Sequence, residues 1–335
     1  QDLRPLGLME VTRKLWTKLV IHRIHRVISK HHGLQTQHCG GLQERGTDTA
    51  LLQTLNMLEA MQADWDDSPH ESDREIHLDF MSWDTRKAFD SIGNTVQYLA
   101  WRRMGVPAEV ALWLISLDLG GRFIALTPYA NSQLRRIKMK SATSRQHYLL
   151  LRSLGLIHDR GLTQGDIKSP LGWILVFDIL ITALNQCNHA KYPKAPIAGV
   201  HCYTLTPSVF LDDLTSLTST RAHTQELAET ISAFNGIFGT RFNPTKFRFN
   251  STAADPTPVY IYDWQWQPQE VPLADGDATA TVLGIELALG YKWTTQVQKV
   301  ILKVRGIAKL MRASRAKPTT KAAVLVASTL ESLTY

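Results

Sequence analysis

Cysteine is scarce in this sequence, and no long apolar run occurs in it. The three cysteines, Cys39, Cys187 and Cys202, are odd in number and widely separated. No disulfide framework is therefore expected, and a reducing intracellular compartment is favoured. The longest apolar stretch, residues 171–184, is interrupted by Asp178 and is too short to cross a bilayer. We therefore expect no membrane as a partner.

Acidic residues are missing from residues 292–321, where nine basic residues occur. Apolar residues recur there at helical spacing, which predicts a helix over about residues 295–314 with one apolar and one basic face. A solvated surface helix usually mixes both signs of charge. The one-sided charge favours contacts to nucleic-acid phosphates, with Lys299, Lys303 and Lys309 as candidates, and the net charge of +7 agrees with a polyanionic partner.

Two adjacent carboxylates, Asp212 and Asp213, stand between short apolar runs. The pattern predicts a β-hairpin whose tight turn is formed by the two acids. Adjacent negative charges repel each other, and a divalent cation bound between them removes that repulsion. Aspartate is also a common turn residue, so the pair alone leaves a plain structural turn open.

A third carboxylate, Asp84, follows the apolar and partly alternating residues 76–81. These residues predict a buried strand that ends at Asp84. A helix is predicted over about residues 94–104, with Gly105 placed to end it. If the strand ends beside the predicted hairpin, Asp84 is a third ligand of the same metal cluster; otherwise it is a turn or helix-entry acid.

Between these acids lies a segment, residues 161–171, that contains two glycines and the pair Gln164-Gly165. Ser169 and Pro170 predict the N-cap and first turn of an apolar helix that runs to about Leu184. The glycines allow the loop to approach a bulky partner closely. An ordinary loop–helix junction explains Ser169 and Pro170 but gives no reason for Gln164-Gly165.

Taken in chain order, these blocks resemble motifs A, B and C of the reverse transcriptases, most closely the non-LTR retrotransposon and group II intron branch. The family's Asp-x-x-x-Ala-Phe-Asp corresponds to residues 84–90, its Gly-x-x-Gln-Gly-x-x-x-Ser-Pro to residues 161–170, and its aromatic-x-Asp-Asp to residues 210–213. Flanking blocks are similar to fingers segments at residues 4–6 and 37–47, to motif D at residues 242–246 and to the primer grip at residues 282–285. The resemblance spans nearly the whole chain, although Ile167-Lys168 replaces the usual Pro-Leu.

The resemblance implies an α+β right-hand polymerase with fingers, palm and thumb. Its antiparallel palm sheet would carry the Asp-Asp hairpin, with helices packed behind the sheet. The fingers would cover residues 1–75, the palm residues 76–290 with part of the fingers inserted at about 106–160, and the start of the thumb residues 291–335. We expect a chain cut at both ends, from a longer polypeptide with other domains.

The resemblance also implies an RNA-directed DNA polymerase, a nucleotidyltransferase that adds dNTPs to a DNA primer on an RNA template. Asp84, Asp212 and Asp213 would bind two Mg²⁺ ions, with Mn²⁺ as a substitute. Lys246 would donate a proton to the pyrophosphate leaving group. The catalytic role of these four residues follows from the family motifs that they match.

Further residues would bind the substrates by the same resemblance. Phe89 would pack under the sugar of the incoming nucleotide, where its ring excludes a 2′-hydroxyl; the alternative is a core phenylalanine. The other nucleotide-binding candidates are Arg4, Thr85, Gln164 and Gly165, and the primer and template candidates are Leu283, Gly284, Lys299, Lys303 and Lys309.

Three alternatives remain for the function. A viral RNA-dependent RNA polymerase usually has Gly-Asp-Asp in motif C, and Phe210 counts against it. A domesticated or maturase-like RNA-binding domain without polymerase activity commonly lacks a catalytic aspartate, whereas all three are present here. The third alternative, a decayed retroelement copy whose intact motifs are recent leftovers, stays open. For a retroelement enzyme we expect the nucleus slightly ahead of an organelle.

Overall fold

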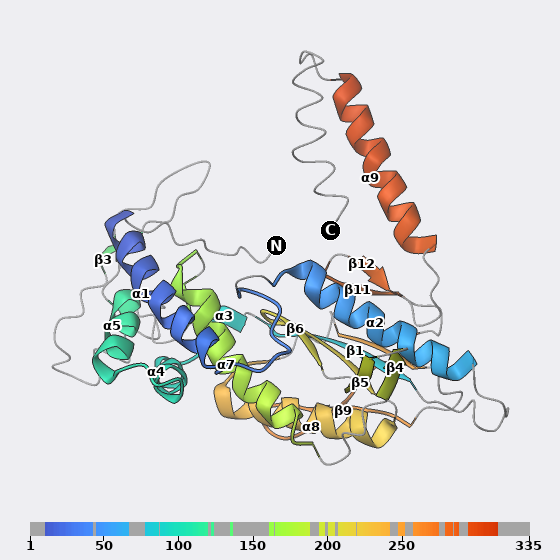
Figure 1. Ribbon diagram of the computed structural model, residues 1–335, viewed down its shortest axis with the longest axis horizontal. Coiled ribbons are helices and arrows are strands. Elements are labelled where there is room, and N and C mark those ends of the chain that lie inside the picture. The colour runs from blue at the N-terminus through green and yellow to red at the C-terminus, as the bar shows by residue number, and fades with distance from the viewer. Residues whose placement is uncertain are drawn as a thin grey trace.

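The computed structural model has a four-stranded antiparallel sheet at its centre, with the strand order β6-β7-β1-β8 (Figure 1). These strands are β1 (Asp79–Asp84), β6 (Ser208–Phe210), β7 (Asp213–Thr218) and β8 (Arg248–Ser251). The described residues are 11–42, 45–66, 78–86, 88–119, 122–123, 135–136, 161–163, 165–187, 194–197, 200–204, 207–218, 220–241, 247–251, 257–274, 279–283, 285–287 and 294–313. The sheet brings together strands that lie far apart in the sequence.

Helices α7 (Lys168–Leu184) and α8 (Arg221–Phe238) pack against each other and share the main core with one face of the sheet. Trp83 of β1 and Leu214 of β7 are cross-strand partners and point into this core. The ends of α8 are set by Thr220, whose hydroxyl accepts the His223 N–H, and by Gly239 at a φ of 72°.

The opposite face of the sheet holds a second core. Phe80 and Leu217 are cross-strand partners, and alternation along the strands points them away from Trp83. They pack with Leu58 of α2 (Thr47–Asp66) and with the hairpin of β11 (Ala280–Val282) and β12 (Ile285–Leu287). Figure 1 shows α2 and this hairpin side by side.

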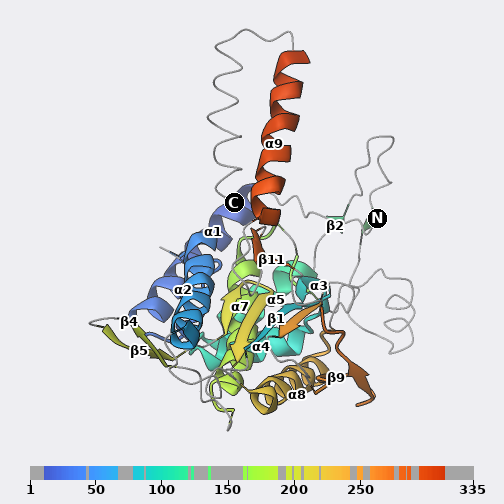
Figure 2. The same ribbon diagram turned by 90° about the vertical axis from the view of Figure 1, so that its right-hand side faces the viewer.

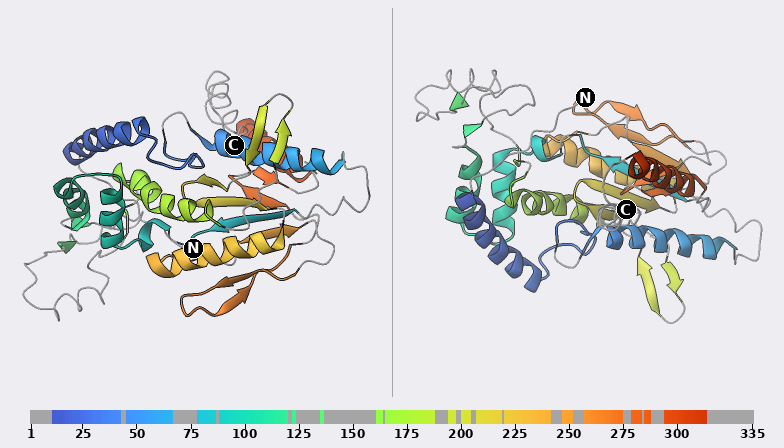
Figure 3. Two further views of the ribbon diagram at one scale, coloured as in Figure 1. Left: turned by 60° about the horizontal axis from the view of Figure 1, so that its bottom comes forward. Right: turned by 90° about the horizontal axis from the view of Figure 1, so that it is seen from above.

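The remaining elements surround these two cores. Helices α1 (Val11–Lys30), α3 (Ala88–Ser91), α4 (Asn94–Arg103) and α5 (Ala108–Leu119) lie near the start of α7, as Figures 1 and 3 show. Short strand pairs complete the described part: β2 (Arg122–Phe123) with β3 (Arg135–Arg136), β4 (Lys194–Ile197) with β5 (Val200–Thr204), and β9 (Tyr260–Tyr262) with β10 (Pro268–Glu270).

Helix α9 (Thr294–Ala313) projects away from the sheet (Figure 2). Its apolar residues are largely exposed, including Val297 at 52% and Leu302 at 67%. Its first turns are attached to β12, because Lys299 Nζ lies 2.8 Å from Glu286 Oε1 and the Gln296 side chain accepts the Glu286 N–H at 3.0 Å. The helix therefore has a fixed base and an exposed shaft.

The predicted α+β class with an antiparallel central sheet and helices behind it is confirmed. The predicted helix before Gly105 is present as α4, and Gly105 follows it at a φ of 78°. The predicted domain limits stay predictions, since residues 67–77 and 288–293 lie outside the described ones. None of the helices in the described ranges combines the length and the apolar character that a bilayer span requires.

Candidate active site

The structure places Asp84 directly beside Asp213. Asp84 is the last residue of β1, Asp213 is the first residue of β7, and the two are cross-strand partners. Because side chains alternate along each strand, both carboxylates lie on the face opposite Trp83 and Leu214, away from α7 and α8. Asp84 is half-buried and Asp213 is exposed, so both are accessible from solvent.

The hairpin that holds the adjacent acids differs from the prediction in its turn. Phe210 pairs with Asp213, so the two turn residues are Leu211 and Asp212, not the two aspartates. The pairing takes Asp213 into the strand and aligns it with Asp84. Leu211 adopts a left-handed φ of 56°, which costs about 1–2 kcal/mol for an L-residue with a side chain. Surrounding contacts must hold this turn.

One of these contacts comes from Trp173, a residue of α7 that the sequence analysis missed. Its indole Nε1–H donates to the Leu211 carbonyl at 2.9 Å. Trp173 is fully buried, and its ring centre lies 5.6 Å from that of Phe89 in α3. A single side chain therefore contacts both the predicted sugar-binding residue and the hairpin that carries Asp212 and Asp213. Its place three residues after Pro170, inside an apolar run, indicated only a core residue.

The segment after Asp84 is fixed by the loop that precedes α7. Gly161 has a φ of 98°, and a Cβ at this position would lie 3.1 Å from Asp90 Cα. The Leu162 N–H donates to the Phe89 carbonyl at 2.6 Å, and the Gly161 N–H donates to Ile92 at 2.7 Å. The close approach predicted for this glycine is therefore to the chain's own α3. Thr85 is buried near the start of the same segment.

The start of α7 also differs from the prediction. The helix begins at Lys168, so Ser169 lies in its first turn and does not cap it. The Ser169 N–H donates to the Asp166 carbonyl at 3.2 Å, and its hydroxyl donates to the Thr163 carbonyl at 2.7 Å. The helix therefore begins two residues earlier than predicted, and these bonds tie the preceding loop to its first turn.

Asp166 is a second residue that the sequence analysis missed. Its carboxylate is buried, and Arg13 of α1 donates to it at 3.2 Å. This contact joins α1 to the loop of Gly165, which itself has a φ of 92°. The charged position next to Gly165 was the available sequence signal.

The predicted primer and template residues lie on a separate part of the molecule. Leu283 occupies the first position of the two-residue turn between β11 and β12, with a φ of 49°. Lys299 forms the ion pair with Glu286, a contact that the sequence analysis did not foresee. Lys303 and Lys309 are exposed on α9. Four predicted site residues lie outside the described residues: Arg4, Gln164, Lys246 and Gly284.

The carboxylates fit a divalent metal ion in their chemistry. Within the described ranges, no cluster of three or more His, Cys, Asp or Glu side chains is arranged to hold a metal. Mg²⁺ sites that act on nucleotides, however, usually take one or two protein carboxylates and fill the other positions with phosphate and water oxygens. Asp84 and Asp213 side by side, with Asp212 next in the chain, supply this oxygen donor set.

Comparison with known proteins bears on the family and the fold. A family model described as reverse transcriptase (RNA-dependent DNA polymerase) matches residues 1–287. A solved structure of Candida tropicalis telomerase in complex with a TWJ fragment of telomeric RNA matches with a TM-score of 0.50 and 8% identity, over 82% of this chain and 36% of that chain. At this identity the likeness shows the fold alone.

Two further telomerase structures match less well. The apo Candida tropicalis enzyme truncated from its C-terminal domain has a TM-score of 0.45 at 9% identity, over 76% of this chain and 44% of that one. The Candida albicans enzyme in complex with the same type of RNA fragment has a TM-score of 0.41 at 10% identity, over 86% of this chain and 41% of that one. The chain therefore spans 36–44% of the length of these solved proteins.

Proposed function

Since the chain belongs to the reverse transcriptase (RNA-dependent DNA polymerase) family, we propose that it is the polymerase core of a retroelement enzyme. It extends a DNA primer on an RNA template with dNTPs, and it works within a longer polypeptide. The observation that supports this most directly is the cross-strand pair Asp84–Asp213, with Asp212 in the adjoining turn. The non-LTR or group II intron origin stays a prediction from the sequence motifs.

Members of the family generally use divalent metal ions and bind RNA templates. We assign the binding of two Mg²⁺ ions to Asp84, Asp212 and Asp213. When bound, such a pair of ions activates the primer 3′-hydroxyl and neutralises the pyrophosphate leaving group. The protein's own part is to present the carboxylates at one end of a rigid sheet, so that little reorganisation is needed when the substrates bind.

Other residues position the incoming nucleotide. Phe89 is half-buried against Trp173, which limits how far its ring can move away from an added 2′-hydroxyl. This packing supports a selection for dNTPs over rNTPs. Because Lys246 matches the family motif, we assign to it the donation of a proton to the pyrophosphate leaving group. We assign to Lys303 and Lys309, which are exposed on α9, the binding of phosphates of the primer–template duplex.

Primer extension by single variants of the full chain tests the proposal. Asp84→Asn, Asp212→Asn and Asp213→Asn remove a metal ligand while keeping the side-chain shape. Loss of a residue that only supports a metal ligand lowers activity about 10–100-fold, so loss of a ligand itself should exceed that. Glu109→Gln, an exposed carboxylate in the first turn of α5, is the control and should keep wild-type activity.

Duplex binding, measured by fluorescence anisotropy, separates chemistry from affinity. The three aspartate variants should bind an RNA–DNA primer–template within a few fold of the wild type. A variant that keeps activity within tenfold would remove its aspartate from the mechanism. A folded wild-type chain that binds RNA tightly and incorporates no dNTP would support the RNA-binding alternative instead.

A further inference from the structure

The edge of the central sheet next to the turn of Leu211 and Asp212, called the catalytic turn here, is covered by a segment that overlaps the fingers-like block at residues 37–47. Residues 35–41, called the strap here, run between α1 and α2, and His38 pairs in parallel with Val209 of β6. The Cys39 N–H donates to the Val209 carbonyl at 2.8 Å, and the Val209 N–H donates to the Gln37 carbonyl at 3.2 Å. The strap therefore extends the sheet beyond β6, the strand that leads into the catalytic turn.

The end of the strap touches the catalytic turn itself. A Cβ at Gly40 would lie 2.7 Å from the Leu211 backbone nitrogen, a distance that real Cβ atoms do not reach. A Cβ at Gly41, which has a φ of 70°, would lie 2.9 Å from Ile174 of α7. Together with the Trp173 hydrogen bond to the Leu211 carbonyl, the strap holds the left-handed residue of the turn from two sides.

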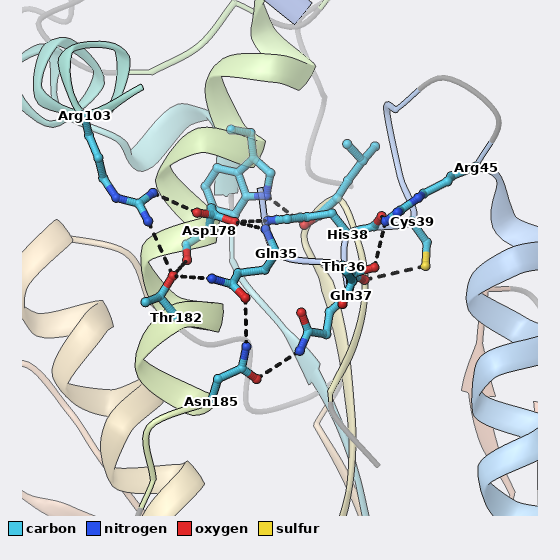
Figure 4. Close-up of polar contacts among 12 residues, drawn as sticks. Gln35, Thr36, Gln37, His38, Cys39, Arg45, Arg103, Asp178, Thr182 and Asn185 are labelled. Carbon is cyan, nitrogen blue, oxygen red and sulfur yellow. Dashed lines mark hydrogen bonds and ion pairs between the residues drawn. The ribbon is translucent and has the colours of Figure 1, made fainter. Parts of the chain in front are cut away.

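The strap is tied to α7 through one buried carboxylate, Asp178 (Figure 4). Its Oδ1 accepts the Gln35 N–H at 2.8 Å and lies 3.3 Å from His38 Nε2. Its Oδ2 accepts a hydrogen bond of 2.8 Å from Arg103 of α4. Burial raises the pKa of Asp178, but the contacts with His38, Gln35 and Arg103 together lower it by more, so its net pKa lies below the usual range.

Amide side chains add a second set of contacts between the strap and α7. Gln35 Nε2 donates to the Thr182 hydroxyl at 3.3 Å, and Gln37 Nε2 donates to Asn185 Oδ1 at 2.9 Å. Asn185 Nδ2 in turn donates to Gln35 Oε1 at 3.1 Å. These contacts fix the start of the strap, whereas Gly40 and Gly41 fix its end against the turn.

We propose that Asp178 is a positioning residue, which acts through the strap to set the place of Asp212 and Asp213 relative to Asp84. The proposal rests on the proposed polymerase function and deepens it. No atom of Asp178 needs to touch a substrate. Loss of its charge leaves His38 and Arg103 without their shared carboxylate and releases the strap, so the catalytic turn loses one of its two supports.

Two variants with matched controls test the proposal in primer extension. Asp178→Asn removes the anchoring charge, and Gly40→Ala pushes the strap off Leu211 without touching any carboxylate. Asp79→Asn is the control for the first variant, because Asp79 is as buried as Asp178 and also pairs with an arginine, Arg221, at 3.3 Å. It lies at the end of β1 that is far from Asp84. Gly93→Ala is the control for the second, because a Cβ there meets no atom within 4 Å.

We expect Asp178→Asn and Gly40→Ala to lower kcat about 10–100-fold at a nearly constant KM for dNTP. Activity is expressed per folded molecule at a temperature where all variants are folded. Asp79→Asn should lose stability and Gly93→Ala should stay near the wild type, and neither should show this loss of kcat. Retention of kcat within twofold in both test variants, or an equal loss in Asp79→Asn, would overturn the positioning role and leave the proposed function standing.

Alkylation of Cys39 reports on the strap without any need for catalysis. Burial raises the pKa of this thiol to about 11, so it reacts slowly while the strap is in place. Mass spectrometry of the peptide that contains Cys39 should show faster modification in both test variants and wild-type rates in the controls. Wild-type rates in the test variants would contradict the release of the strap.

Failure of the proposed function remains distinguishable from failure of this inference. If the folded wild-type chain extends no primer, the function is rejected. The positioning role is then decided by Mn²⁺ affinity, measured by electron paramagnetic resonance on the full chain. Weaker Mn²⁺ binding in Asp178→Asn and Gly40→Ala than in their controls would support the role, and equal binding would exclude it.

Discussion

The Trp173 indole donates to the Leu211 carbonyl at 2.9 Å while its ring packs 5.6 Å from the Phe89 ring. The three residues belong to α7, the catalytic turn and α3, which are far apart in the sequence. Trp173 also stacks on Phe177 at 5.2 Å, which anchors it in the main core. Core packing is therefore directly connected to the two parts of the site to which we assign the metal and the sugar.

Trp173→Phe tests this connection. The change removes the N–H donor and keeps an aromatic ring between Phe89 and Phe177. Loss of one partner of a partly buried hydrogen bond should lower the free energy of unfolding by about 1–3 kcal/mol, measured by urea denaturation. We expect kcat for primer extension to fall as well, because the left-handed turn at Leu211 loses a support.

The matched control is Trp16→Phe on α1, where the side chain is 65% exposed. Exposed substitutions of this kind usually change stability by less than about 0.5 kcal/mol. Equal stability and activity losses in the two variants would show that the Trp173 hydrogen bond contributes nothing specific.

Part of this site was predictable from the sequence, because patterns of neighbouring residues define the elements that carry it. The alternating residues before Asp84 define a strand, and Gly105 marks the end of α4. Asp84 ends this strand beside the hairpin, as expected, but its pairing with Asp213 was not predicted because Asp213 was assigned to the turn. Local pattern is sufficient here because each signal lies within a few residues of the feature that it predicts.

The rest was not predictable, because it depends on long-range contacts. A leucine at positive φ has no residue-type signature, so the turn was assigned to Asp212 and Asp213 in place of Leu211 and Asp212. Asp178 interrupts an apolar run in the sequence, and its bond to the Gln35 N–H joins residues 143 positions apart. No spacing rule connects such a pair before the chain folds.

Phe89→Val tests sugar selection. If the ring excludes a 2′-hydroxyl, the smaller side chain should raise rNTP incorporation while dNTP incorporation stays largely intact, because no metal ligand changes. The ratio of the two kcat/KM values is the measurement. Phe238→Val is the control, since Phe238 is also half-buried against another ring, that of Phe234 at 4.5 Å. An unchanged ratio in Phe89→Val would identify Phe89 as a core residue only.

Asp178 should make stability depend on pH in a defined direction. Its folded pKa is lowered, so the carboxylate stabilises the fold above its unfolded pKa of about 3.9. That contribution is lost as the pH falls through the lower folded pKa. At pH 7, Asp178→Asn should lower the free energy of unfolding by about 1–3 kcal/mol, because Arg103 and the Gln35 N–H lose a charged hydrogen-bond acceptor.

The difference between wild type and Asp178→Asn should therefore shrink between pH 4 and pH 2. Urea denaturation of both proteins at each pH measures it, and other acids cancel in the difference. A difference that stays constant down to pH 2 would show that the charge of Asp178 is not what stabilises the strap.

Helix α9 should bind the primer–template duplex through phosphates. Lys303 and Lys309 are exposed on its shaft, whereas Lys299 is engaged with Glu286 at the base. The double variant Lys303→Gln/Lys309→Gln should weaken binding similarly for all sequences, because phosphates carry no base information. The slope of log K against log salt should fall by up to about 0.9 for each lost contact with a B-form duplex.

Lys299→Gln should change this slope less, since its main described partner is a carboxylate. A slope that is unchanged in the folded double variant would reject the assignment of α9 to the duplex, while the aspartate chemistry, which depends on other residues, would stand.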